Sequence, residues 1–339
     1  MPADTVRRIT EAAGRQGLAD EIEEATAVGH GVARAPVSVI DHLQQVSVDG
    51  AMVPLVHGQW AEVKSLAIGR VVPLAGGPKA VDLSYFARLA DHVRFTTEAR
   101  LEFERRGTEN AREVVAVSDG AEWIQGFLDE HCPVAVRIID WSHAAGYLST
   151  AGQALFGPGS ADGQAWVETQ REALWKERPE SVVEELKRLE TDSALEPVRV
   201  ARQYLERRVD QLRYAEFRAA GYPVGSGIVE SANKVVVEER LKGRGRRWEP
   251  ANVDPMLVLR CMLASDRWCQ RWPTVGKRLR RPHRRRPTYP RPAAAPSPPA
   301  EPSPQPPLAP HLPPPPMVVD GKPTPIHPWK LYPACRAKT

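Results

Sequence analysis

Residues 113–140, which read EVVAVSDGAEWIQGFLDEHCPVAVRIID, decide the fold class of this chain. Residues 113–118 form a short run rich in β-branched side chains, which predicts a strand that ends at Asp119. Residues 121–131 predict a helix, and residues 134–140 predict a second buried strand. Because a strand, a helix and another strand follow one another, we expect an α/β architecture with some parallel strand pairing.

The regions upstream add further strands and helices. Residues 45–56 (QVSVDGAMVPLV) alternate apolar and polar side chains around Asp49, and the Asp-Gly pair there is typical of a strand that enters a turn. Residues 60–72 predict a second strand. Residues 83–106 have apolar side chains at helical spacing and predict a helix, and residues 6–27 predict a helical lead.

The regions downstream are almost wholly helical. Residues 142–220 are rich in Glu, Arg, Leu and Ala and have no strand signal, so we expect an all-helical insertion. Residues 228–241 predict another helix, a basic glycine-rich loop follows, and residues 255–267 predict the final helix. The expected organisation is a helical lead, the first part of the core, the insertion, the last core helices with the basic loop, and a tail: residues 1–40, 41–141, 142–220, 221–270 and 271–339.

The tail differs from the rest of the chain in charge and in composition. Residues 271–339 carry a net charge of +11 and 21 of the 33 prolines, whereas the other residues carry −7. Such a segment cannot bury enough apolar surface to offset the entropy of ordering it, so we predict disorder from about residue 275. Residues 277–291 hold eight basic and no acidic side chains, which suits a polyanion; a solubilising tail is the alternative.

Composition also excludes several classes of protein. A chain of 339 residues with 42% hydrophobic residues is long enough to build a sizeable core. No run approaches the roughly 18 apolar residues that a membrane span needs, and the N-terminus lacks the apolar region of a signal peptide. The four cysteines are scattered without a CxxC pair, which disfavours a disulfide framework or a zinc ribbon. We therefore expect a cytoplasmic protein with no membrane partner.

Two aspartates, Asp49 and Asp119, each precede a glycine at the expected end of a strand. Ligand-binding groups gather beyond the carboxyl ends of strands in α/β sheets. If the two strands are neighbours, both carboxylates enter one crevice, where they repel each other unless a divalent cation lies between them. This is the arrangement of two-metal phosphoryl transfer, which needs a third carboxylate. A plain turn is the alternative for each Asp-Gly pair taken alone.

The candidate for the third carboxylate is Glu230, in the stretch GYPVGSGIVESANK. A Gly-Ser-Gly sequence precedes the expected helix, and Glu230 falls in about its first turn. Asn233 and Lys234 lie three and four residues farther on, so the three side chains share a helix face. A helix N-terminus also favours phosphate oxygens nearby. The alternative is an ordinary acidic residue that interacts favourably with the helix dipole.

Four blocks of sequence, in this order, resemble the DDE transposases of bacterial insertion sequences, and specifically the ISKra-four family, a distant relative of the Mutator-like group. The blocks are VSVDGAMVPL (46–55), VAVSDGAEWIQ (115–125), IIDWSHAAGYL (138–148) and GYPVGSGIVESANKVVVEERLKGRGRRW (221–248). The resemblance covers about residues 40–265, and the last block is its most specific part.

The resemblance implies an RNase H-like fold, that is, a mixed sheet flanked by helices with an all-helical insertion before the last catalytic helix. It also implies a DDE triad that binds two Mg²⁺ or Mn²⁺ ions, with Asp49, Asp119 and Glu230 as the first, second and third acids. Asp140 and His143 resemble the (C/D)xxH element of related transposases, which supports the metal site or contacts DNA. For His143, a buried structural role is the alternative.

The loop from Arg240 to Trp248 predicts a nucleic-acid interface beside this site. Five cations, two glycines and one aromatic side chain within nine residues suit a phosphate backbone and a stacked base, whereas a solvated charged turn is the alternative. With Lys234 from the preceding helix, the expected DNA-binding residues are Lys234, Arg240, Lys242, Arg244, Arg246, Arg247 and Trp248.

The resemblance therefore implies a nucleoid-associated DNA transposase that cleaves element ends and joins them to target DNA. A homodimer is compatible with it, because transposases commonly act as dimers or larger assemblies. Two alternatives stay open: an RNase H-like nuclease without strand transfer, and an inactive DNA-binding remnant. Only about 44 residues precede the first expected strand, so we expect a shortened N-terminal region relative to the family.

Overall fold

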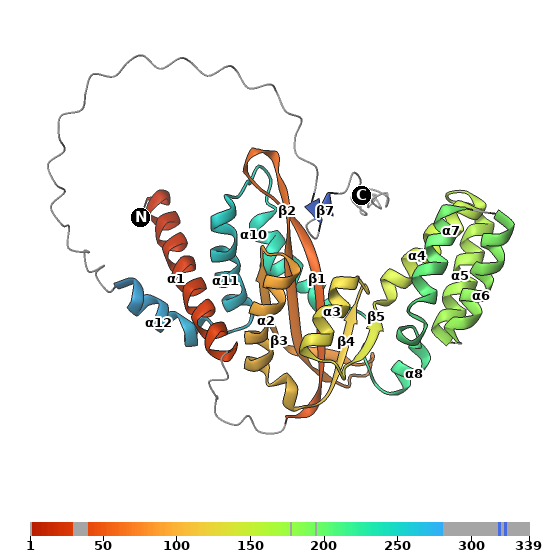
Figure 1. Cartoon of the computed structure of the whole chain (residues 1–339), viewed down its shortest axis with the longest axis horizontal. Helices are drawn as coiled ribbons and strands as arrows, with labels where there is room; N and C mark the ends of the chain where they lie inside the picture. Colours follow the sequence, from red (N-terminus) through yellow and green to blue (C-terminus); the bar gives the residue numbers. More distant parts are fainter. Residues whose placement is uncertain are drawn as a thin grey trace, which may run out of the picture.

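The computed structural model describes residues 2–29, 40–176, 178–193 and 195–280, together with two short strands farther on, β6 (Val318–Val319) and β7 (Lys322–Pro323). Its centre is a five-stranded mixed sheet in the order β3-β2-β1-β4-β5 (Figure 1). The first three strands form an antiparallel meander, whereas β4 and β5 run parallel to β1. This topology confirms the expected α/β class and is consistent with an RNase H-like fold. The strands are β1 (Ile40–Pro54), β2 (Trp60–Val72), β3 (Lys79–Arg88), β4 (Ala111–Ser118) and β5 (Val136–Ile139).

Helices cover both faces of the sheet, because successive side chains of a strand point to opposite faces. Val46 and Val48 of β1 pack on one face with α2 and α3. Ala51 and Val53 pack on the other face with α11 and with a helix formed by α9, the π-helix η4 and α10. The helices are α2 (His92–Arg106), α3 (Glu122–His131), α9 (Gly227–Ala232), η4 (Asn233–Glu238), α10 (Glu239–Leu241) and α11 (Val253–Ala264).

Helices α4–α8 form a separate helical segment beside β5 (Figure 1). Leu148, Leu174 and Leu205 belong to the apolar core of this segment, which continues onto β4 and β5. The chain leaves the sheet at Trp141 and returns at Val224, whose carbonyl accepts a hydrogen bond from the Trp141 N–H (3.0 Å). The helices are α4 (Trp141–Phe156), α5 (Ala161–Lys176), α6 (Pro179–Ser193), α7 (Glu196–Glu206) and α8 (Tyr214–Ala219).

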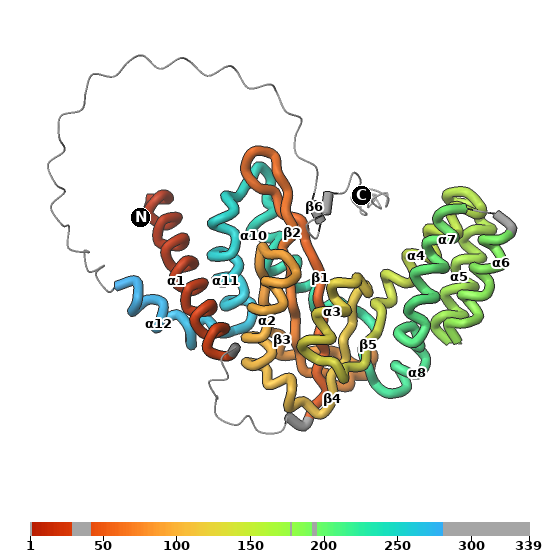
Figure 2. Tube along the Cα trace, in the orientation of Figure 1, coloured from red at the N-terminus to blue at the C-terminus, as the bar shows by residue number. Residues whose placement is uncertain are grey.

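Two helices far apart in the sequence lie side by side. α1 (Ala3–Gly29) packs along α11 and α2, and α12 (Trp268–Arg280) packs against α1 (Figure 2). The long α1 confirms the expected helical lead over residues 6–27.

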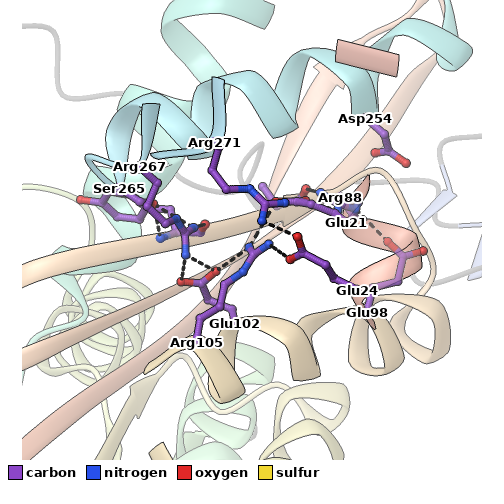
Figure 3. Close-up of polar contacts among 12 residues, drawn as sticks. Glu21, Glu24, Arg88, Glu98, Glu102, Arg105, Asp254, Ser265, Arg267 and Arg271 are labelled. Atoms are coloured by element: carbon purple, nitrogen blue, oxygen red, sulfur yellow. Dashed lines mark hydrogen bonds and ion pairs between the residues drawn. The ribbon is translucent and has the colours of Figure 1, made fainter. Parts of the chain in front are cut away.

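A buried arginine–glutamate network ties these helices to β3 (Figure 3). Arg88, with 1% of its side chain exposed, donates hydrogen bonds to Glu21 (2.6 Å) and Glu98 (2.8 Å). Burial alone would raise the pKa of Glu21, but the charges of Arg88 and Arg105 outweigh it and lower that pKa to about 2. The network consists of Glu21, Glu24, Arg88, Glu98, Glu102, Arg105, Arg267 and Arg271.

The predicted helix over residues 83–106 is wrong in its first part. Residues 83–88 belong to β3, and α2 begins only at His92, after Asp91 has capped its N-terminus. Residues 85–87 are all buried, because helices cover this strand on both faces. A strand that is buried on both faces has a continuous apolar run, and periodicity alone does not distinguish such a run from a buried helix.

Asp49 is not at the end of a strand, contrary to expectation. β1 continues to Pro54, so Asp49 lies inside the strand and pairs with Ser65 of β2. The turn of the hairpin comes later, at η1 (Val56–Gly58). The glycine after Asp49 provides space and not a turn, because a Cβ at Gly50 would lie 2.3 Å from a carboxylate oxygen of Glu62.

The described first part of the predicted tail, residues 271–280, is helical. α12 extends to Arg280, so the disorder predicted from about residue 275 does not begin there, and the rest of the tail, apart from β6 and β7, lies outside the described residues. Cys132, Cys261 and Cys269 are free thiols. In the part of the chain that the structure describes, no helix combines the length and the apolar character that a membrane crossing needs.

Candidate active site

Asp49 and Asp119 are called the acid pair below: Asp49 lies in β1, and Asp119 directly follows β4, the neighbouring parallel strand. Val46 of β1 is in register with Ala116 of β4, and the two aspartates come three residues later along each strand direction. Burial, and then the nearby charge of Asp119, raise the pKa of Asp49 to about 7. The two strands are neighbours, as the sequence-based argument required, and a shared crevice for the two carboxylates stays a prediction.

Asn233 connects the acid pair to the helix that follows the helical segment in the chain, the one formed by α9, η4 and α10. Its side-chain N–H donates to Asp49 Oδ2 (2.8 Å), while the Gly50 N–H donates to Asp49 Oδ1 (2.7 Å). Asn233 is the first residue of the π-helix η4, a rare helix type that occurs frequently at functional sites. Its carbonyl oxygen Oδ1 is buried and has no hydrogen-bond partner, which leaves one oxygen ligand available beside the acid pair.

The turn that carries Asp119 is held by the helical segment. Tyr204 of α7 donates its hydroxyl to the Asp119 carbonyl (2.6 Å), and Arg208 donates twice to the Gly120 carbonyl (2.7 and 3.2 Å). The Arg208 guanidinium also lies 4.3 Å from the ring centroid of Tyr204, which stacks on Tyr147. Gly120 has a φ of 74°, and a Cβ there would lie 2.6 Å from Arg208, so only glycine fits this contact. The Asp119 carboxylate accepts the N–H of the second residue after it (2.9 Å).

Glu230, the predicted third acid, is not assembled with the acid pair. It lies on α9, one turn before Asn233 and on the same helix face, and it is exposed. No three acidic, histidine or cysteine side chains among the described residues are arranged to hold one metal ion. The structure thus brings together Asp49 and Asp119 and leaves Glu230 on the adjacent helix.

Asp140 links the strands to the loop that precedes α9. It is 1% exposed, and its two carboxylate oxygens accept the backbone N–H groups of His143 (3.0 Å) and Ser226 (2.6 Å). Gln45 of β1 holds the same loop through the Gly225 carbonyl (2.9 Å). Asp140 therefore orients the elements around the site, and both of its oxygens are already in use.

His143 is half-buried at the start of α4, and its charge lowers the pKa of Asp49, after the larger effects already named. This effect places the imidazole in the neighbourhood of Asp49. Sequence reasoning missed Glu62, whose charge slightly raises the same pKa, and its ion-pair partner Lys64. The Lys64 side chain is 1% exposed and lies 4.8 Å from the ring centroid of Trp123, which packs partly buried against the core. The only sequence signal was a lysine amid the apolar residues of β2.

The basic loop is anchored to the tip of the β1–β2 hairpin by Trp248. Its backbone N–H donates to the Pro54 carbonyl (3.1 Å), and its carbonyl accepts the Val56 N–H (3.0 Å). Its indole N–H donates to the Leu241 carbonyl (3.2 Å), and its ring packs partly buried against the core. Trp248 thus holds the loop in place, and its ring is only partly accessible for stacking with a base.

The predicted cations of the loop are all exposed, but several have partners within the chain. The Arg240 guanidinium lies 5.7 Å from the Trp248 ring centroid, and Lys242 pairs with Glu238 (2.7 Å). Arg246 donates through Nη1 to two backbone carbonyls, those of residues 239 and 240. These three side chains are nevertheless exposed, so phosphates can reach them. The same exposure holds for the three remaining cations: Lys234, Arg244 and Arg247.

No protein-family model matches this chain, and no curated protein sequence matches it either. Among solved structures, it is similar to a Drosophila P element transposase strand transfer complex, with 12% identity over 70% of this chain and 67% of that one, at a TM-score of 0.23. It is also similar to NurA with manganese, with 13% identity over 81% and 66%, at a TM-score of 0.13.

Proposed function

We propose that this chain is a DNA transposase of a bacterial insertion sequence, which cleaves and joins DNA by metal-dependent phosphoryl transfer. The observation that carries the proposal is the acid pair. Asp49 lies in β1 and Asp119 directly follows the adjacent parallel strand β4, and the pKa of Asp49 is raised to about 7. Among the described contacts, neither carboxylate pairs with a lysine or an arginine. A divalent cation is the natural partner of such a pair.

The side chains around the acid pair fit Mg²⁺ or Mn²⁺, which prefer oxygen ligands. Asp49 and Asp119 would supply carboxylate oxygens, and the buried Asn233 Oδ1, which lacks a partner, would supply a third. Glu230 would join from the same helix face when its exposed side chain turns toward the site. When bound, the two ions lower the pKa of an attacking water and stabilise the charge that develops on the phosphate oxygens.

The residues of the chain would position the reactants. Tyr204 and Arg208 fix the peptide that carries Asp119, and Asp140 fixes the loop that leads to Glu230. The basic loop would bind backbone phosphates, so that DNA affinity falls steeply with salt. A freed 3′-hydroxyl would then attack target DNA in the same site, and this reaction needs no covalent bond between protein and DNA.

The test is Asp119→Asn, which removes a metal ligand without removing a phosphate contact. We expect this variant to lose DNA cleavage in Mg²⁺ while its salt-sensitive DNA binding stays nearly unchanged. The matched control is the double variant Arg246→Ala with Arg247→Ala, which should weaken binding about equally for all sequences and flatten the salt dependence. If Asp119→Asn cleaves as well as the wild type, the assignment of the second acid is wrong.

Strand-transfer assays with pre-cleaved ends separate the proposal from its alternatives. Cleavage without joining would indicate an RNase H-like nuclease. DNA binding of equal affinity with and without Mg²⁺, and no cleavage by the wild type, would indicate an inactive remnant.

A further inference from the structure

The tip of the β1–β2 hairpin presents an exposed aromatic side chain. Trp60 is the first residue of β2 and is 48% exposed, although nearby hydrophobic side chains of the sheet such as Val53 and Val63 are fully buried. A single exposed apolar side chain needs no explanation by itself. Its surroundings are what distinguish Trp60.

Trp60 lies near the basic loop, and the end of β1 separates Trp60 from Trp248. Its partner in the hairpin is Pro54 of β1, and the Pro54 carbonyl accepts the Trp248 N–H, while Leu55 forms an isolated bridge with Trp248. Strands lie about 4.8 Å apart, so the backbones of Trp60 and Trp248 are about 10 Å from each other. Figure 1 shows the hairpin tip (orange) and the loop after α10 (cyan) together at the top of the view. The exposed indole and the exposed cations thus share one end of the molecule.

The two tryptophans at this end have different freedom to bind a ligand. The Trp248 indole N–H donates a hydrogen bond to the Leu241 carbonyl, and its ring packs against the core. The Trp60 indole, by contrast, makes no hydrogen bond or ring contact among the described residues. The turn of the hairpin is closed by a hydrogen bond from the Leu55 N–H to the Gln59 carbonyl (2.8 Å). An exposed indole beside arginines is an arrangement that can bind unpaired bases.

We propose that Trp60 stacks on an unpaired base of DNA, while the exposed side chains of Arg244, Arg246 and Arg247 bind the adjacent phosphates. This inference rests on the proposed function and specifies its substrate, a DNA end with single-stranded or frayed bases. Five residues of extended chain separate Asp49 from Pro54, a distance of about 17 Å. A duplex end that ran along β1 would cover this distance in about five base steps.

The test compares Trp60→Ala with the wild type in metal-free DNA binding, measured by fluorescence anisotropy on a single-stranded oligonucleotide and on a blunt duplex of equal length. We expect Trp60→Ala to bind the single strand about 10-fold more weakly and the duplex less than 2-fold more weakly. Trp60→Phe should retain most of the single-strand affinity, because a phenyl ring still stacks. Leu74→Ala is the matched control, since Leu74 is 55% exposed in the turn after β2 and should have no effect.

Arg244→Ala should weaken both DNA forms and reduce the salt slope by about one. Equal single-strand affinity of Trp60→Ala and the wild type, or equal loss on both DNA forms, overturns the stacking role while leaving the proposed function intact. A wild-type protein that binds neither DNA form overturns both. Because Trp60 is exposed, each variant should keep the melting temperature of the wild type, which confirms that folding is not the cause of any loss.

Discussion

Two clusters of carboxylates in this molecule have opposite electrostatic character. In the arginine–glutamate network, Glu21, Glu24 and Glu102 each bond an arginine of a neighbouring element (Figure 3), and the pKa of Glu21 falls to about 2. At the acid pair, burial and a second carboxylate raise the pKa of Asp49 to about 7. The network balances its charges within the chain and is therefore structural. The acid pair has no such arginine partner among the described contacts, which is why we propose a divalent cation for it.

The two clusters also impose opposite pH dependences on stability. Because the pKa of Glu21 is lowered, its contribution is complete above its ordinary pKa of 4.5 and is lost as the pH falls toward 2. Because the pKa of Asp49 is raised from its ordinary 3.8, its ionisation costs free energy in the folded state, and stability falls as the pH rises from about 4 to 7. Without metal ions, these two groups together favour a stability maximum near pH 4 to 5.

The largest expected effect comes from unbalancing the network. Arg88→Met leaves Glu21 and Glu98 buried without one of their cations, and we expect a loss of about 3–5 kcal/mol in the free energy of unfolding at pH 7, measured by urea denaturation. Arg70→Met is the control, because its pair with Asp82 is exposed and should contribute less than about 1 kcal/mol. Similar small losses in both variants would contradict the structural role of the network.

Removing a charge from the acid pair should have the opposite sign. Asp49→Asn should raise the free energy of unfolding at pH 8 without metal by about 2 kcal/mol and leave it unchanged at pH 4, because the uncompensated charge is gone. The new amide can also donate to Asn233 Oδ1, which has no partner. The control is Asp162→Asn at an exposed site. Mn²⁺ should stabilise the wild type and not Asp49→Asn; a destabilised variant at pH 8 would refute an uncompensated pair.

The smallest effect tests whether the helical segment tunes the acid pair. Tyr204→Phe removes the hydroxyl that binds the Asp119 carbonyl, and we expect a loss of about 1 kcal/mol in stability and a roughly 10-fold weaker Mn²⁺ affinity, measured by calorimetry. Tyr222→Phe removes a hydroxyl that binds Glu113 at the start of β4, so it should cost similar stability without changing Mn²⁺ affinity. Equal Mn²⁺ affinity in the two variants would show that the Tyr204 contact serves stability alone.

Much of the fold could be predicted from sequence, because most elements have a clear local pattern. The strands around Asp119 and the helix after the Gly-Ser-Gly loop follow from β-branched runs and helical spacing. β3 could not be predicted, because burial on both faces hides the alternation that marks a strand. The Asp-Gly pair at Asp49 also led to a wrong prediction, because the sequence alone does not distinguish a glycine that makes room for Glu62 inside a strand from a glycine in a turn.

The candidate site could be predicted only in part. Asp49 and Asp119 could be paired because parallel strands carry their side chains to the same level. Tyr204 and Arg208 could not be linked to them, because about 85 residues separate these side chains from Asp119 and only tertiary packing joins them. Likewise, the composition of the basic loop indicated Trp248 as the stacking side chain, and nothing local reveals that its indole is bonded to the chain itself.

The hydrogen bond between Trp141 and Val224 means that the helical segment begins and ends at one point of the sheet. A segment with adjoining ends can be gained, lost or exchanged during evolution without changing the distances within the remaining core. A short turn between these two residues would close the chain and leave the Asp140–Ser226 contact in place. Such an exchange would also replace Tyr204 and Arg208, so one recombination event could change the support of Asp119 without altering either residue of the acid pair.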